Sequence, residues 1–103
     1  MELLTEELRA RLPPLYSQEA EEEPMVYAKF FLPGTGWTWY VTEGGEQEGD
    51  FLFFGFVVGF DSEFGYFLLS ELESVRSTLG LTVERDLAFT EGRLIDVVPA
   101  PDT

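Results

Sequence analysis

Residues 37–60 read WTWYVTEGGEQEGDFLFFGFVVGF, and this stretch decides the fold. Aromatic and β-branched residues alternate with polar ones over residues 37–43, which predicts a strand with two different faces. Residues 51–60 are apolar on both faces, which indicates a central strand covered on both sides or a surface for a dimer. Gly55 and Gly59 interrupt this second strand and predict a bend, a bulge or the close approach of another group.

The same alternation predicts two further strands, at residues 25–32 and 65–69, one before and one after this pair. A Pro-Gly turn at residues 33–36 would join the first two strands, and an acidic loop at residues 44–50 would join the next two. A turn at residues 61–63 leads to the fourth strand. This order predicts an antiparallel meander of four strands, to which Leu81 and Val83 would add a short fifth strand.

Two helices are expected beside this sheet. Thr5 would cap the first, over residues 6–12, which begins with glutamates and ends with arginines as the helix dipole favours. Ser70 would cap the second, after strand four, through a capping box with Glu73. The apolar side of this second helix would consist of Leu72, Val75 and Leu79, with Gly80 at its end.

Together these elements predict an α+β fold in which both helices cover one face of the sheet. The chain of 103 residues has the length of a single domain, 1–103. Within it, residues 17–24 are expected to form an acidic surface loop, and residues 97–103 are expected to be a frayed tail.

The composition excludes several kinds of catalysis. The chain has no histidine and no cysteine, so it lacks the ordinary acid-base residue of neutral pH and any thiolate nucleophile or metal ligand. No phosphate-binding loop, nucleophile elbow or spaced set of metal ligands is present in the sequence. We therefore expect a protein that is not an enzyme, with no catalytic residues, no metal and no cofactor.

The charge of the chain constrains its partners. Twenty acidic side chains face six basic ones, for a net charge of −14. Direct binding of nucleic acid or anionic lipid is not expected, because phosphate contacts need lysine and arginine. A protein partner with a basic surface fits this charge, although acidity serving only solubility is the commoner situation. The start of the chain is acidic and its longest apolar run is short, so we expect a cytoplasmic protein with no membrane contact.

The candidate interaction residues fall into an acidic and an aromatic group. Loops rich in adjacent glutamates are usually solvated, and paired tryptophans are usually core, so both groups have an ordinary structural interpretation as well. Tyr27 and Tyr40 would form a binding platform beside Lys29 if their faces were exposed. The acidic group comprises Glu19, Glu21, Glu22, Glu23, Glu43, Glu46, Glu48 and Asp50, and the aromatic group comprises Tyr27, Trp37, Trp39 and Tyr40.

Five blocks of sequence, taken in order, resemble a bacterial family, the domain of unknown function 2958 family. The blocks are LTEELRARLPPLY (4–16), YAKFFLPGTGWTWYVTEG (27–44), DFLFFGFVVGF (50–60), GYFLLSELESVR (65–76) and LGLTVERDLAF (79–89). The resemblance implies a cytosolic protein with an accessory role on plasmids or integrated mobile elements. It implies no activity, cofactor or functional residue.

Three functional hypotheses follow. The first is an interaction module for a basic partner, whose narrowest form imitates DNA, since carboxylates on alternate strand positions lie about 7 Å apart. The second is a structural or regulatory subunit, such as a homodimer, that associates through the apolar face of Phe51, Phe53 and Val57. The third is a small-ligand-binding domain that uses the cluster of Trp37, Trp39 and Tyr40.

Overall fold

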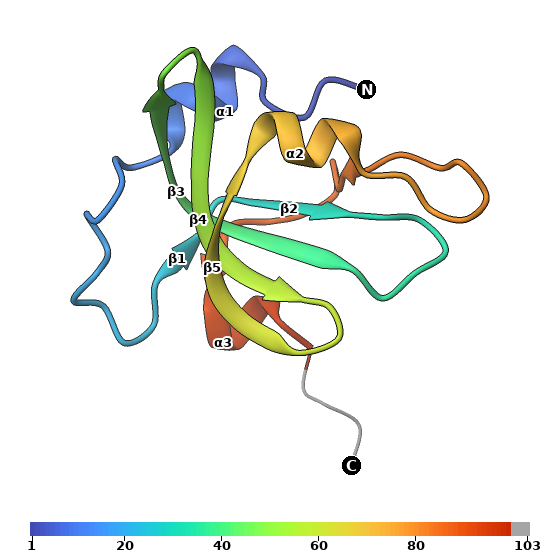
Figure 1. The fold of residues 1–103 in the computed structure, drawn as a ribbon. Helices are drawn as coiled ribbons and strands as arrows, with labels where there is room; N and C mark the ends of the chain where they lie inside the picture. The colour runs from blue at the N-terminus through green and yellow to red at the C-terminus, as the bar shows by residue number, and fades with distance from the viewer. Residues whose placement is uncertain (100–103) are drawn as a thin grey trace.

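The computed structural model describes residues 1–99, and its centre is an antiparallel five-stranded sheet with the strand order β5-β4-β3-β2-β6 (Figure 1). Strands β2 to β5 follow one another in the chain and are neighbours in the sheet, so the expected meander is confirmed. The strands are β2 (Ala28–Phe31), β3 (Thr38–Gln47), β4 (Asp50–Val58), β5 (Ser62–Leu68) and β6 (Glu84–Arg85).

Three short helices and a second, two-stranded sheet complete the α+β fold. Figure 1 shows α1 and α2 towards the end of the sheet where the β3–β4 hairpin turns, and α3 towards the other end. The second sheet is the antiparallel pair of β1 and β7. These elements are α1 (Glu6–Arg11), β1 (Met25–Val26), α2 (Leu69–Ser74), β7 (Gly92–Arg93) and α3 (Leu94–Val97). Within residues 1–99, no helix is long and apolar enough to cross a membrane.

The core lies on one face of the five-stranded sheet. Leu8 of α1 and Leu72 of α2 belong to the same buried cluster as Phe53 of β4, which agrees with the expectation that both helices cover one face. Phe51 is also buried and Val57 packs against the cluster, so the face expected to join a homodimer is already covered within the chain. Burial of each large side chain contributes about 1.5–3 kcal/mol.

A β-bulge shapes the middle of the sheet. The register of β3 against β4 shifts between Val41 and Glu43, which leaves Thr42 as the extra residue. Gly55 lies opposite Val41, and a Cβ atom there would come within 1.9 Å of the carbonyl oxygen of Tyr40. The expected close approach at this glycine is therefore confirmed, and it permits the bulge.

The bulge also explains why the first predicted strand, 25–32, is two strands. Ala28 is paired with Val41, the last β3 residue before the bulge. Beyond this point β3 departs from its regular register, and Met25 and Val26 pair instead with β7. The alternation of buried residues continues across the break, because Val26, Ala28 and Phe30 are all buried.

The prediction of an acidic loop at residues 44–50 is wrong. β3 continues to Gln47, β4 begins at Asp50, and only Glu48 and Gly49 form the turn. Both turn residues have positive φ, +50° and +83°, as a two-residue hairpin turn requires. Glu-Gly is not one of the usual dipeptides of such turns, so the sequence signal was weak. The fourth strand likewise begins earlier than predicted, at Ser62.

The helices differ from the predictions at their ends. The Thr5 hydroxyl accepts a hydrogen bond from Leu8 N at 3.2 Å, so the first cap is confirmed. The second helix begins after Leu68 instead of Ser70, because Glu71 Oε1 accepts from Leu68 N at 2.9 Å. It ends at Ser74, and Leu79 is exposed.

The C-terminal part contains more structure than expected. The fifth strand is present, but it is formed by β6 instead of residues 81–83. Val97 belongs to α3, and Val98 N donates to Leu94 O at 3.0 Å, so the tail is ordered through these residues. The rest of the predicted frayed tail, residues 100–103, lies outside the described residues. Residues 17–24 contain no helix or strand, as expected of a loop.

Candidate functional site: an aromatic pocket with an acidic rim

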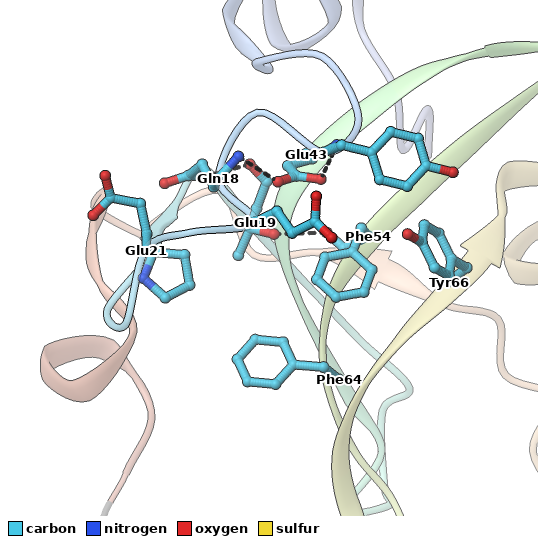
Figure 2. A pocket seen from close by; sticks show the side chains of 10 residues that line it. Gln18, Glu19, Glu21, Glu43, Phe54, Phe64 and Tyr66 are labelled. Atoms are coloured by element: carbon cyan, nitrogen blue, oxygen red, sulfur yellow. Dashed lines mark hydrogen bonds between the residues drawn. The ribbon is translucent and has the colours of Figure 1, made fainter.

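A pocket of about 280 Å³ lies on the face of the sheet opposite the core, between the loop of residues 15–24 and strands β3 to β5 (Figure 2). We call it the aromatic pocket. Its aromatic residues are Tyr16, Phe54, Phe64 and Tyr66, and its carboxylates are Glu19, Glu21 and Glu43.

Strand pairing places the aromatic side chains of the pocket on one face. Phe54 pairs with Tyr66, and Phe64 lies two residues earlier on β5, so all three project to the same side. The Phe54 ring lies 4.7 Å from the Tyr66 ring and 5.8 Å from the Phe64 ring, between centroids. Phe64 is 46% exposed and Tyr66 is 50% exposed. Aromatic rings that remain this accessible on a sheet face are typical of contact surfaces.

The β-bulge brings Glu43 into the pocket. Strict alternation from Trp39 and Val41 would place Glu43 on the core face, but the extra residue at Thr42 puts it opposite Phe54, on the pocket face. Glu43 is only 3% exposed. Its Oε1 accepts a hydrogen bond from Tyr16 N and its Oε2 accepts one from Gln18 N, each at 2.7 Å. A buried carboxylate is satisfied by such charge-assisted bonds, and here they fasten the loop to the sheet.

Gln18 adds further connections between the loop and the sheet. Its side-chain amide donates to Met25 O at 3.0 Å and to Thr42 O at 2.9 Å, and it accepts from Met25 N at 2.8 Å. Tyr16 has a φ of +72°, which is uncommon for a residue with a side chain and costs free energy. The bonds to Glu43 and Gln18 therefore hold the loop in a conformation that places the Tyr16 ring 6.3 Å from the Tyr66 ring.

The electrostatic surroundings of the pocket act on Tyr66. Partial desolvation raises the pKa of its phenol, and the neighbouring Tyr16 phenol raises it further. The negative charges of Glu43 and Glu19 have the same effect, because they disfavour a second anion nearby. Tyr66 is therefore a neutral hydroxyl beside the pocket at neutral pH.

The acidic loop supplies the rim of the pocket. Glu19 and Glu21 are exposed and line the pocket, whereas Glu22 and Glu23 do not line it. Glu23 instead fastens the far end of the loop to α3, since its Oε2 accepts from Ile95 N at 3.0 Å. Arg93 supports this contact by donating to Glu23 O at 3.1 Å.

The remaining acidic candidates lie elsewhere, on the β3–β4 hairpin. Glu46 forms an ion pair with Arg9 of α1, and Glu48 is in the turn. Asp50 accepts hydrogen bonds from the Ser70 hydroxyl and from Phe51 N. These bonds, that of Ser70 first, hold the pKa of Asp50 below its ordinary value. The eight acidic candidates thus fall into separate groups, and three of them contribute to the pocket.

The aromatic candidates are not part of the pocket. Trp39 is buried in the core, which agrees with its structural interpretation, and Trp37 stacks on it with ring centroids 5.9 Å apart. Tyr27 is half-buried and packs against the core. Tyr40 is buried on the other face, where burial, and then the charge of Asp86, raise its pKa. The condition for a platform of Tyr27 and Tyr40 is therefore not met.

Sequence reasoning missed the four aromatic residues of the pocket. Phe54 lies within a strand that the sequence predicts, but Phe64 falls between the predicted turn, 61–63, and the predicted fourth strand, 65–69, whereas the structure places it in β5. The alternation of Phe64 and Tyr66 is the available signal, but the predicted strand begins only at Gly65. No pattern in the sequence indicated that the loop of residues 15–24 would fold over these rings.

The pocket has the chemistry of a binding site. Among residues 1–99, no group of three or more acidic side chains is placed to hold a metal ion. The pocket offers carboxylates that attract cations, and aromatic faces that interact favourably with them.

The fold and the site define an α+β domain with a helix-covered inner face and an acidic aromatic pocket on its outer face. The chain belongs to the family described as Protein of unknown function (DUF2958), which it matches over residues 3–98. This range includes the whole pocket and confirms the resemblance seen in the sequence blocks. No curated protein and no solved structure matches the chain.

Proposed function

We propose that this protein is a non-catalytic, cytosolic interaction module that binds a basic surface of another protein. The observation that supports it is the aromatic pocket, in which the exposed rings of Phe64 and Tyr66 lie beside the carboxylates of Glu19 and Glu21. Aromatic side chains contribute much of the binding energy of protein interfaces, and complementary charge selects the partner.

The charge of the whole chain supports the same proposal. A net charge of −14 on 103 residues produces a negative potential that attracts basic surfaces and speeds their association. This long-range attraction is screened by salt, whereas contacts inside the pocket are screened less. Binding should therefore weaken as salt increases without disappearing completely.

Imitation of DNA is a narrower form of this proposal with less support. Glu23, Glu43 and Asp50 accept hydrogen bonds within the chain, and Glu46 pairs with Arg9. The acidic groups also lie in separate parts of the fold, on the loop and at the hairpin turn. A role on mobile elements, as an inhibitor of a DNA-binding enzyme, depends on this narrower form.

Association of two copies through the sheet is the second candidate, and it also has less support. The inner apolar face is covered by α1 and α2. The outer face has exposed aromatic rings, but each of the two copies would carry a net charge of −14. Repulsion of like charges disfavours such a dimer at low salt.

Affinity capture from a bacterial lysate would test the proposal. The tagged chain should retain a basic protein, and the double variant Glu19→Gln/Glu21→Gln should retain much less of it. The variant Glu22→Gln/Glu48→Gln is the matched control, because it also removes two exposed charges and neither residue lines the pocket. Equal retention by all three proteins would contradict the proposal. Release by duplex DNA would favour the imitation of DNA.

A further inference from the structure

We propose that the aromatic pocket binds a single arginine side chain of the partner, with its guanidinium stacked on the Phe54 and Phe64 rings and its N–H groups directed to Glu19. This inference rests on the proposed function and names the chemical group that the site recognises. Four features of the pocket carry it: its size, the arrangement of its rings, its carboxylates, and the lack of an internal cation to fill it.

The size of the pocket fits one side chain. At about 280 Å³, it is slightly smaller than the pockets of roughly 300–1,000 Å³ that hold drug-sized ligands. Phe64 and Tyr66, which line it, are about half exposed, so a side chain attached to a backbone outside the pocket can reach it.

The rings favour a planar cation. The Phe54 and Phe64 rings are nearly parallel, with 8° between their planes. A guanidinium is flat and weakly hydrated, so it stacks on such faces while its edge still donates hydrogen bonds. An ammonium group is strongly hydrated and has no flat face, so lysine gains less from the same rings.

The carboxylates of the pocket leave a place for a positive charge. Glu43 lines the pocket and is held in place by the N–H groups of Tyr16 and Gln18, so the position of its carboxylate is fixed. Glu19 and Glu21 lie at the rim and take part in none of the ion pairs found within residues 1–99. Paired N–H donors of an arginine match a carboxylate in geometry as well as charge.

Within residues 1–99, which include every lysine and arginine, no cationic side chain lines the pocket. All six basic side chains are bonded elsewhere, and none lines it. Arg9 pairs with Glu46, Arg11 with Glu7 and Glu91, and Lys29 with Asp86. Arg76, Arg85 and Arg93 donate to Glu73 O, to the Thr5 hydroxyl and to Glu23 O. A cation in the pocket must therefore come from another molecule.

Titration with N-acetyl-arginine methylamide, followed by NMR of the assigned ring protons, tests this inference. We expect saturable shifts at Phe54, Phe64 and Tyr66. The citrulline analogue, which has nearly the same shape but no charge, should bind at least about tenfold more weakly, and the lysine analogue should also bind more weakly. Equal binding of arginine and lysine analogues, shifts outside the pocket, or no saturable shift would each overturn the inference.

Two variants of the chain sharpen the test. Phe64→Leu keeps an apolar side chain but removes a ring, and Glu19→Gln removes the carboxylate, so each should weaken arginine binding. Glu48→Gln should leave it unchanged. If capture of a basic protein still depends on Glu19 and Glu21 while the arginine analogue does not bind, the arginine assignment fails and the interaction function stands. If the analogue binds but no protein is captured, the interaction function fails instead.

Discussion

Glu43 is the residue on which the pocket depends most directly. Its two carboxylate oxygens each accept one backbone N–H of the loop, from Tyr16 and from Gln18. In Glu43→Gln, the amide would place N–H donors against one of these N–H groups and leave it unsatisfied. We expect a loss of about 1–3 kcal/mol in the free energy of unfolding, measured by urea denaturation.

The matched control for this change is Glu48→Gln, which alters the same side chain at an exposed turn. It should change stability by less than about 0.5 kcal/mol. Amide hydrogen exchange should also show faster exchange at Tyr16 and Gln18 in the Glu43 variant only. Equal stability of the two variants would mean that the loop does not depend on Glu43.

The hydrogen bonds of Asp50 lead us to predict that the stability of the fold depends on pH. The Ser70 hydroxyl, and then Phe51 N–H, bond to its ionised form and lower its pKa in the folded state. A carboxyl with a lowered folded pKa stabilises the fold above its unfolded pKa, near 4, and this contribution is lost as pH falls through the folded value. Asp50→Asn should therefore be less stable than the wild type at about pH 6, and the difference should shrink by about pH 2.

Urea denaturation of both proteins across this pH range measures the effect, and the difference between them isolates Asp50 from the other carboxyls. Ser70→Ala should behave in the same direction, because the hydroxyl is the largest cause of the lowered pKa. A difference between wild type and Asp50→Asn that stays constant down to about pH 2 would contradict this account.

At the scale of elements, the bulge in β3 sets the position of the site. It turns Glu43 to the pocket face, ends the regular pairing of β2, and depends on Gly55 for space. This one irregularity therefore determines the position of Glu43 in the pocket, the attachment of the loop and the separation of β1 from β2.

Gly55→Ala should disrupt this irregularity. The new Cβ would lie 1.9 Å from the Tyr40 carbonyl oxygen, so β3 and β4 must separate, and we expect a loss of stability of about 3 kcal/mol or more. The control is Gly65→Ala on β5, directly across from Gly55, where no atom of residues 1–99 beyond the chain neighbours lies within 4 Å of the new Cβ. It should be tolerated, and similar midpoints of urea unfolding for the two variants would contradict the importance of the bulge.

At the scale of the whole molecule, the net charge of −14 opposes the folded state through self-repulsion. Raising the salt concentration from about 0.01 M to 1 M shortens the Debye length from about 30 Å to about 3 Å and screens this repulsion. The midpoint of thermal unfolding should rise by several degrees. The less charged variant Glu21→Gln/Glu22→Gln/Glu48→Gln should show a smaller rise, and an equal or larger rise would count against self-repulsion.

Much of the fold could be predicted because it depends on local patterns. The cap at Thr5, the alternation in β2 to β4 and the order of strands follow from residue spacing, and they are confirmed. The acidic hairpin turn was missed because Glu48-Gly49 is an unusual dipeptide for it, and the second helix was shifted because Glu71 caps Leu68. The bounds of turns and helices depend on weak local preferences, and contacts with the surrounding structure decide which of these preferences is realised.

The sequence by itself determined the class of fold, the acidic character and the absence of histidine and cysteine chemistry, because composition and periodicity are properties of the chain. Only the tertiary structure decided where the site lies. The pocket joins residues from the loop of residues 15–24 with residues of β3, β4 and β5. Its geometry depends on a bulge that turns the side chain of Glu43 to the opposite face of the sheet. It also depends on the buried carboxylate of Glu43, which holds a loop that is distant in the sequence. Neither has a periodic signature, because both arise from contacts between residues far apart in the chain.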